Sequence, residues 1–160
     1  MTSIERSGYR FCVDLPATKA YYERHSLCDC SCCRNLYAGI QKFFPELDAF
    51  LRDFGVDIAR PDEASSSEEG ASIEYFEVDY TVCGHVEAMG EYEFDLSDSI
   101  PVHIAVRDGF VAPNEQTGEY FTLSVYGIRL PWVLDEPVPQ PQSAQRFARM
   151  KQILNRKHKD

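Results

Sequence analysis

The sequence predicts an α+β domain in which an N-terminal strand and a bent pair of helices pack on an antiparallel sheet of four or five strands. Apolar residues recur at helical spacing in the first half of the chain and alternate with polar residues in the second half. The chain has 160 residues, of which 44% are hydrophobic and 26% are charged, a balance typical of one folded domain. We therefore expect residues 1–136 to form a single domain.

The first predicted element is a strand that ends before Pro16. Tyr9, Phe11 and Val13 alternate with polar neighbours, which is the period of a strand with one buried face. Proline cannot donate a backbone hydrogen bond and therefore closes the strand.

A bent helical pair is predicted next. Its apolar residues recur every three or four positions: Leu36, Ile40, Phe43, Phe44, Leu47, Phe50, Leu51 and Phe54. Pro45 would break a continuous helix, because it lacks an amide hydrogen, but it suits the first position of a new one. We therefore expect a second helix to begin at Pro45 and to end at Gly55, which tolerates the left-handed conformation of a helix cap.

The second half of the chain predicts a sheet. Residues 61–63 favour a short helical turn and residues 65–70 a polar, acidic loop. Strand faces then follow at Val78, Tyr80 and Val82; Tyr92, Phe94 and Leu96; Val102, Ile104 and Val106; and Phe121, Leu123 and Val125. Their short connections favour antiparallel pairing.

The end of the chain is predicted to form a tail separate from the domain. Three alternate prolines predict an extended connector over residues 137–141. Residues 142–160 predict a basic helix with apolar residues at helical spacing.

The net charge of −10 is spread unevenly. Residues 1–141 carry 10 lysines and arginines against 25 acidic residues, whereas residues 142–160 carry 6 against 1. An acidic body repels nucleic acid, so contact with RNA or DNA is expected only through the basic tail. The same field attracts a cationic partner protein. The longest uncharged run, residues 120–128, is too short to span a membrane, so we expect a cytoplasmic protein with no membrane partner.

Four of the six cysteines are crowded into one segment, in which Cys28, Cys30 and Cys33 combine C-x-C with C-x-x-C. In a reducing compartment, clustered cysteines are more often thiols or metal ligands than disulfides. Thiolates at this spacing suit Zn²⁺, which takes four ligands in a structural site. Cys83 is the predicted fourth ligand. The pattern leaves open whether His25, Cys32 or His85 replaces one of these ligands.

Two other interpretations of the cysteines remain open. They can be ordinary cytosolic thiols packed as small apolar side chains. Alternatively, Cys30 and Cys33 have the C-x-x-C spacing of a thiol oxidoreductase at the start of a predicted helix, whose dipole lowers a thiol pKa. The βαβ context that usually accompanies such an exchange site is not predicted here.

The other polar residues favour a surface over a catalytic site. Isolated histidines such as His85 and His103 are more often structural than catalytic. A solvated carboxylate surface is expected from the acidic residues that alternate on the strands: Glu77, Asp79, Glu91, Glu93 and Asp95. The sequence contains no complete catalytic motif, so a non-enzymatic role is favoured.

Four short motifs carry a resemblance. They are the C-x-C-x-x-C-R-N segment from Cys28 to Asn35, Phe44-Pro45-Glu46-Leu47, Phe54-Gly55-Val56-Asp57-Ile58 and Leu130-Pro131-Trp132-Val133-Leu134. With these motifs the chain resembles an uncharacterised family of small bacterial cytosolic proteins over most of residues 9–136. That family has no established activity, so the resemblance implies no catalytic residue.

The sequence thus favours a non-enzymatic binding or adaptor domain with a cysteine-rich, zinc-binding loop. Two other functions remain open. The acidic body fits an immunity-type inhibitor of a basic toxin, and the Cys30/Cys33 pair fits a thiol oxidoreductase.

Overall fold

Strand β4 is the longest element of the fold and the centre of its antiparallel sheet. A computed structural model describes residues 1–108 and 116–140, and within these ranges the sheet has eight strands in the order β1-β2-β4-β7-β6-β5, with β3 and β8 also paired to β4. The strands are β1 (Thr2–Arg6), β2 (Tyr9–Val13), β3 (Glu63–Glu69), β4 (Ser72–Ala88), β5 (Glu93–Ser97), β6 (Ile100–Asp108), β7 (Tyr120–Tyr126) and β8 (Ile128–Pro131). The helices are α1 (Leu15–Arg24), α2 (Ser31–Phe43) and α3 (Pro45–Asp53).

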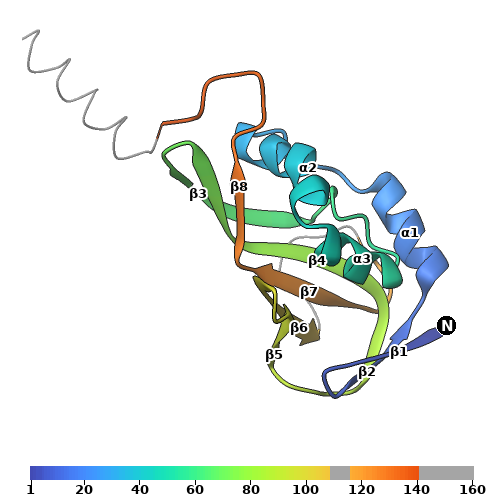
Figure 1. The fold of residues 1–160 in the computed structure, drawn as a ribbon. Coiled ribbons are helices and arrows are strands. Elements are labelled where there is room, and N and C mark those ends of the chain that lie inside the picture. The colour runs from blue at the N-terminus through green and yellow to red at the C-terminus, as the bar shows by residue number, and fades with distance from the viewer. Residues whose placement is uncertain (109–115, 141–160) are drawn as a thin grey trace, which may run out of the picture.

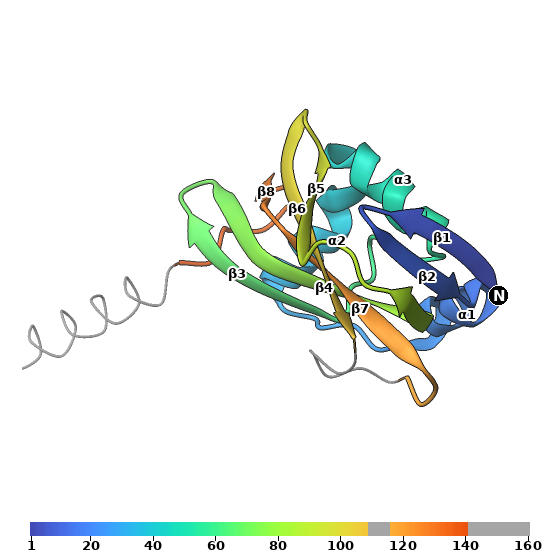
Figure 2. The same cartoon turned by 90° about the horizontal axis from the view of Figure 1, so that it is seen from below.

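The three helices lie on one side of the sheet, and the apolar core lies between these layers (Figures 1 and 2). Phe11 of β2 stacks on Phe121 of β7 with ring centroids 5.1 Å apart, and Phe54 meets Phe11 edge-on at 5.2 Å. All three rings are buried, and burial of each stabilises the fold by about 2–3 kcal/mol. The α+β class and the antiparallel sheet are therefore as predicted.

The bent helical pair is confirmed. Helix α2 ends at Phe43. Helix α3 begins at Pro45, so the proline lies in the first turn of α3, and Phe44 lies between the two helices. Gly55 follows α3 with a φ of +77°, the left-handed conformation that glycine adopts without strain.

None of the described strands lies beside the middle of β4 on the side that faces α1, because β2 pairs with its end and β3 with its beginning. Side chains complete the hydrogen bonding there. Thr81 donates its N–H to Asp62 at 2.8 Å and accepts from the Tyr22 hydroxyl at 2.8 Å. Cys83 donates its N–H to the Thr18 hydroxyl at 3.0 Å. These bonds hold α1 against the sheet edge, since buried backbone groups left unpaired would be costly.

The predicted number of strands is wrong, because residues 1–108 and 116–140 already contain eight where four or five were expected. The predicted loop at residues 65–70 belongs largely to β3, a strand of polar residues with no apolar face to reveal it. Strand β1 forms a hairpin with β2, and β8 pairs with the start of β4. Backbone pairing, of β1 with β2 and of β3 and β8 with β4, stabilises these strands, so their side chains need no strong alternation.

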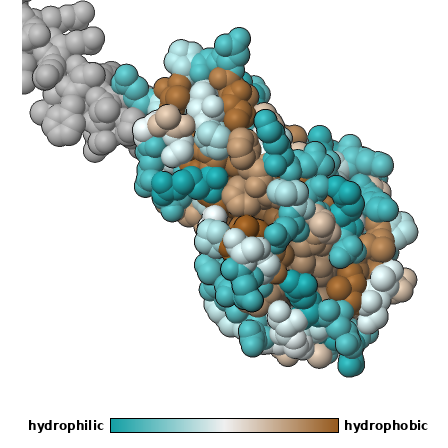
Figure 3. Space-filling view, in the orientation of Figure 1, coloured by the Kyte–Doolittle hydropathy of each residue, from teal (hydrophilic) through white to brown (hydrophobic). Residues whose placement is uncertain are grey.

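The predicted tail falls mainly outside the described residues, which include none of the basic helix at 142–160. The connector is described over residues 137–140, which form no helix or strand, and Val138 packs against the core. None of the described helices has the length and apolar character that crossing a bilayer requires. Hydrophilic side chains cover much of the face that carries the helices, with hydrophobic patches between them (Figure 3).

Gly84 is expected to be essential for joining β2 to β4. Its φ is +132°, and a Cβ atom added there would lie 2.0 Å from the carbonyl oxygen of Cys12. Gly84→Ala should therefore lower the free energy of unfolding by about 2–4 kcal/mol, because the β2 backbone must move. Urea denaturation measures this change.

Gly70→Ala is the matched control. Gly70 also has a positive φ of +64°, but a Cβ atom there meets nothing within 4 Å. In this variant the free energy of unfolding should fall by only about 1–2 kcal/mol, the cost of a left-handed backbone conformation for alanine. Equal losses in the two variants would contradict the close approach of β2 and β4.

Candidate functional site

The cysteine cluster lies where the chain leaves α1 and enters α2 (Figure 1). The sulfur atoms of Cys28, Cys30 and Cys33 all lie within 4.8 Å of one another. Cys28 and Cys30 are exposed, whereas Cys33 is buried in the first turn of α2. We refer to these three residues as the thiol cluster. Its composition and spacing are compatible with metal binding.

The first turn of α2 is fixed to the sheet beneath the thiol cluster. The Tyr75 hydroxyl of β4 donates to the carbonyl of Cys32 at 2.6 Å. The buried Asn35 amide donates to the Pro131 carbonyl at 3.2 Å, and its oxygen accepts from the N–H of Val133 at 2.8 Å. The helix start is therefore held at both strand β4 and the end of β8.

Two side chains of α2 hold the loop that carries Cys28. The Tyr37 hydroxyl donates to the carbonyl of Cys28 at 3.1 Å. Arg34 donates to the carbonyl of Asp29 at 3.2 Å and pairs with Glu136 at 2.9 Å. Residues 25–30 form no regular secondary structure, so these contacts supply much of the order of the loop.

The cluster contains thiols with opposite pKa shifts. Partial burial raises the pKa of Cys30, but hydrogen bonds from the N–H groups of Cys33 and Cys32 and from neighbouring thiols outweigh it, so the net pKa is lowered. Cys30 caps α2 and accepts from the N–H of Cys33 at 3.4 Å, a position where the helix dipole also favours an anion. Burial, followed by its hydrogen bond and charge interaction with Cys30, raises the pKa of Cys33 strongly.

The Tyr37 hydroxyl is a member of this environment that the sequence did not reveal. Burial, and then the neighbouring Cys33 thiol, raise its pKa, so the phenol stays protonated and can donate hydrogen bonds. Tyr37 lies one helical turn after Cys33, and this four-residue spacing on a helix is the signal that could have identified it.

The thiol cluster does not include the predicted fourth ligand, Cys83. Cys83 lies on β4 beside Thr18, and burial raises the pKa of its thiol. Two of the alternative ligands also point elsewhere. The Cys32 thiol lies 3.7 Å from Glu68 of β3, and the buried His25 ring stacks on Tyr21 with centroids 4.9 Å apart.

The remaining alternative ligand, His85, belongs to a different group of metal-ligating side chains. Its donor atom lies within 4.8 Å of those of Cys12 and Glu87, which occupy β2 and β4. His85 and the thiol cluster therefore belong to two separate groups of ligating atoms.

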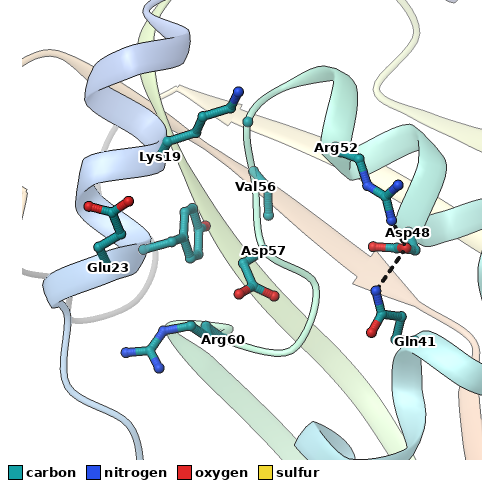
Figure 4. A pocket seen from close by; sticks show the side chains of 10 residues that line it. Lys19, Glu23, Gln41, Asp48, Arg52, Val56, Asp57 and Arg60 are labelled. Atoms are coloured by element: carbon teal, nitrogen blue, oxygen red, sulfur yellow. Dashed lines mark hydrogen bonds and ion pairs between the residues drawn. The ribbon is translucent and has the colours of Figure 1, made fainter.

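A cleft between α1, α3 and the segment after α3 has walls of mixed charge (Figure 4). Three cations and three carboxylates line it: Lys19, Arg52, Arg60, Glu23, Asp48 and Asp57. Asp48 accepts from both Arg52 and Gln41, so its charge is already compensated within the fold. No residue of the cleft belongs to either group of metal-ligating residues found in the described parts of the chain.

Asp79 was expected on a solvated carboxylate surface, but it is only 4% exposed. Its partner in the β4–β7 register is Ser124, whose hydroxyl donates to the Asp79 carboxylate at 2.5 Å. Burial, and then the nearby charge of Glu77, raise the pKa of Asp79 to about 6 against the opposing effects of this hydrogen bond and of Arg107. The prediction of a solvated carboxylate is therefore wrong for Asp79, because the face of β4 that is turned away from the helices is also buried at this residue.

The chain shows no significant match to any model of a known protein family, to any curated protein or to any solved structure.

The raised pKa of Asp79 predicts a pH-dependent stability. The folded chain binds the proton more tightly than the unfolded chain, whose aspartate titrates near about 3.9, so this group's contribution to the free energy of unfolding falls as pH rises from about 4 to about 6. Asp79→Asn should remove that decrease. Urea denaturation across this pH range measures the difference between variant and wild type.

Asp98→Asn is a suitable control, because Asp98 is exposed. Its difference from the wild type should stay nearly constant over the same pH range. If Asp79→Asn gave an equally constant difference, the buried carboxylate would not titrate as described.

Proposed function

We propose that the chain is a binding domain whose thiol cluster holds a zinc ion. The observation that carries this proposal is the approach of three cysteine sulfurs to within 4.8 Å of one another at the start of one helix. Thiolates are preferred zinc ligands, at about 2.3 Å from the ion, so modest side-chain rotations would bring all three into range.

A bound zinc ion would also offset the repulsion between neighbouring thiolates of the cluster. Burial, and then the neighbouring Cys30, raise the pKa of Cys33, because an apolar setting and a second negative charge both disfavour its thiolate. A divalent cation reverses that effect and favours deprotonation of each thiol that it binds. Zinc binding should therefore release protons and weaken as pH falls.

Three ligands leave the fourth position of a tetrahedral zinc ion open. Cys28 and Cys30 are exposed, so a donor from solvent or from a partner could approach the ion. The Cys32–Glu68 contact brings β3, which carries three glutamates, beside the cluster. This acidic strand supports a cationic protein as the partner.

Replacing the three cysteines of the cluster with serine should lower the zinc content by about one equivalent per chain. It should also lower the melting temperature of the zinc-loaded protein, because metal binding free energy adds to folding free energy. Elemental analysis of protein purified without chelators measures the first effect and calorimetry the second.

Cys32→Ala is the matched control for this experiment. Cys32 lies within the same segment, but its thiol faces Glu68 and is outside the thiol cluster. The control should keep the zinc content of the wild type. An unchanged zinc content in the triple-serine variant would exclude the proposed site.

A second candidate function, thiol–disulfide exchange, is favoured by the opposite pKa shifts of Cys30 and Cys33. The exposed Cys30 thiolate would attack a substrate disulfide, form a mixed disulfide and release one substrate thiolate. Cys33, once deprotonated, would attack the Cys30 sulfur and release the second substrate thiolate. The substrate disulfide gains two electrons, and Cys30 and Cys33 become a disulfide.

Alkylation of the metal-free protein tests this candidate. Iodoacetamide should label Cys30 faster than Cys33 near neutral pH, because only the thiolate reacts and Cys30 has the lowered pKa. Mass spectrometry of labelled peptides across a pH series gives the rate at each cysteine. If every cysteine titrated near about 8.5, exchange would lack its activated nucleophile.

A further inference from the structure

A second set of metal-ligating side chains lies where β2 and β4 meet. The ligand atoms of Cys12, His85 and Glu87 all lie within 4.8 Å of one another. These residues share no member with the thiol cluster and come from strands rather than from one loop. We propose that they bind a second divalent transition-metal cation, independently of the proposed function of the thiol cluster.

The backbone arrangement explains how these side chains converge. Cys12 and His85 are direct partners in the antiparallel β2–β4 register, where paired side chains stand next to each other. The neighbouring Gly84 has no Cβ atom, which allows the Cys12 carbonyl to approach it closely. The two strands are thereby held near enough for a sulfur and an imidazole to share one ion.

A local irregularity brings in the carboxylate. The register shifts between Arg10 and Phe11, whose partners are Ala88 and Val86, so Glu87 between them has no partner on β2. A bulge of this kind re-aims the side chain of the extra residue. It accounts for the approach of Glu87 to the Cys12–His85 pair, although the three residues are not all direct neighbours in the register.

The histidine has an unsatisfied position that a cation would complete. The Nδ1 atom of His85 is buried and makes no hydrogen bond to any residue that the structure describes. The carboxylate of Glu119 lies 3.4 Å from this atom, and the Glu119 carbonyl accepts from the N–H of Gly84 at 3.0 Å. Glu119 is therefore held beside Nδ1 by the backbone, and its negative charge would favour a cation at this atom.

The donor set selects the class of cation. A thiolate and an imidazole favour zinc-like transition metals over Mg²⁺ or Ca²⁺, which prefer oxygen ligands. Cys12, His85 and Glu87 supply three protein ligands, and the nearby charge of Glu119 favours a cation there. Such an ion would link the N-terminal hairpin to β4, so its binding would stabilise that end of the sheet.

Metal binding by the triple-serine variant of the thiol cluster tests the second site alone. After addition of zinc chloride and removal of the excess, this variant should retain about one equivalent of zinc per chain, and His85→Ala in the same background should lose it. With cobalt(II) chloride instead, a thiolate-to-cobalt charge-transfer band should form and should disappear in Cys12→Ser. A folded triple-serine variant that binds neither metal would overturn the proposal.

If the triple-serine variant does not fold, the second site can be tested in the chain that keeps all three cysteines of the thiol cluster. His85→Ala alone should lose about one equivalent of zinc, whereas cobalt bound at the thiol cluster should keep its charge-transfer band. His103→Ala is the control, since His103 also pairs with a strand carboxylate, Asp95, at 2.6 Å, but is outside the ligand group. Equal zinc content in the wild type, His85→Ala and His103→Ala would overturn the second site, whether or not the thiol cluster binds zinc.

Discussion

The buried middle of β4, which has no neighbouring strand among the described residues on the side facing α1, is the constraint on which the arrangement of this protein depends. Backbone groups of Thr81 and Cys83 are buried without a neighbouring strand on one side, and side chains must supply their hydrogen bonds. Tyr22 and Thr18 do so from α1, while Asp62 does so from the segment before β3. This requirement fixes the position of α1 against the sheet. It therefore also fixes the point at which the loop from α1 to α2 begins.

Strand β4 also links the two groups of metal-ligating side chains. Near its beginning, the Tyr75 hydroxyl binds the carbonyl of Cys32 and so supports the helix turn that carries the thiol cluster. Near its end, His85 and Glu87 face Cys12 of the neighbouring strand. One long strand therefore supports two groups of ligating side chains of different chemistry, one made of thiols and the other of sulfur, nitrogen and oxygen donors.

The two candidate functions of the thiol cluster follow from the same physical feature. A helix N-terminus and several hydrogen-bond donors stabilise the Cys30 thiolate, which suits both a metal ligand and a nucleophile. The two uses compete, since zinc withdraws electron density from a bound thiolate and makes it a weaker nucleophile. Occupancy of the site by metal would then decide whether the exchange chemistry is accessible.

The sequence by itself determined the features that depend on short-range spacing. The break between α2 and α3 follows from the covalent structure of Pro45, and the end of α3 from the conformational freedom of Gly55. Cys28, Cys30 and Cys33 lie within six residues at the start of a helix, so local geometry is enough to bring them together.

Only the tertiary structure decided what depends on strand pairing. Strand β3 is polar and is stabilised by its backbone pairing with β4. Backbone pairing does not require apolar side chains, so the sequence of β3 shows no apolar pattern. Cys83 points toward α1 instead of joining the thiol cluster, and His85 lies beside Cys12, 73 positions earlier in the chain, because the β2–β4 register pairs them. Register is set by long-range packing and backbone pairing, and the spacing of residues along a single strand does not encode its partner.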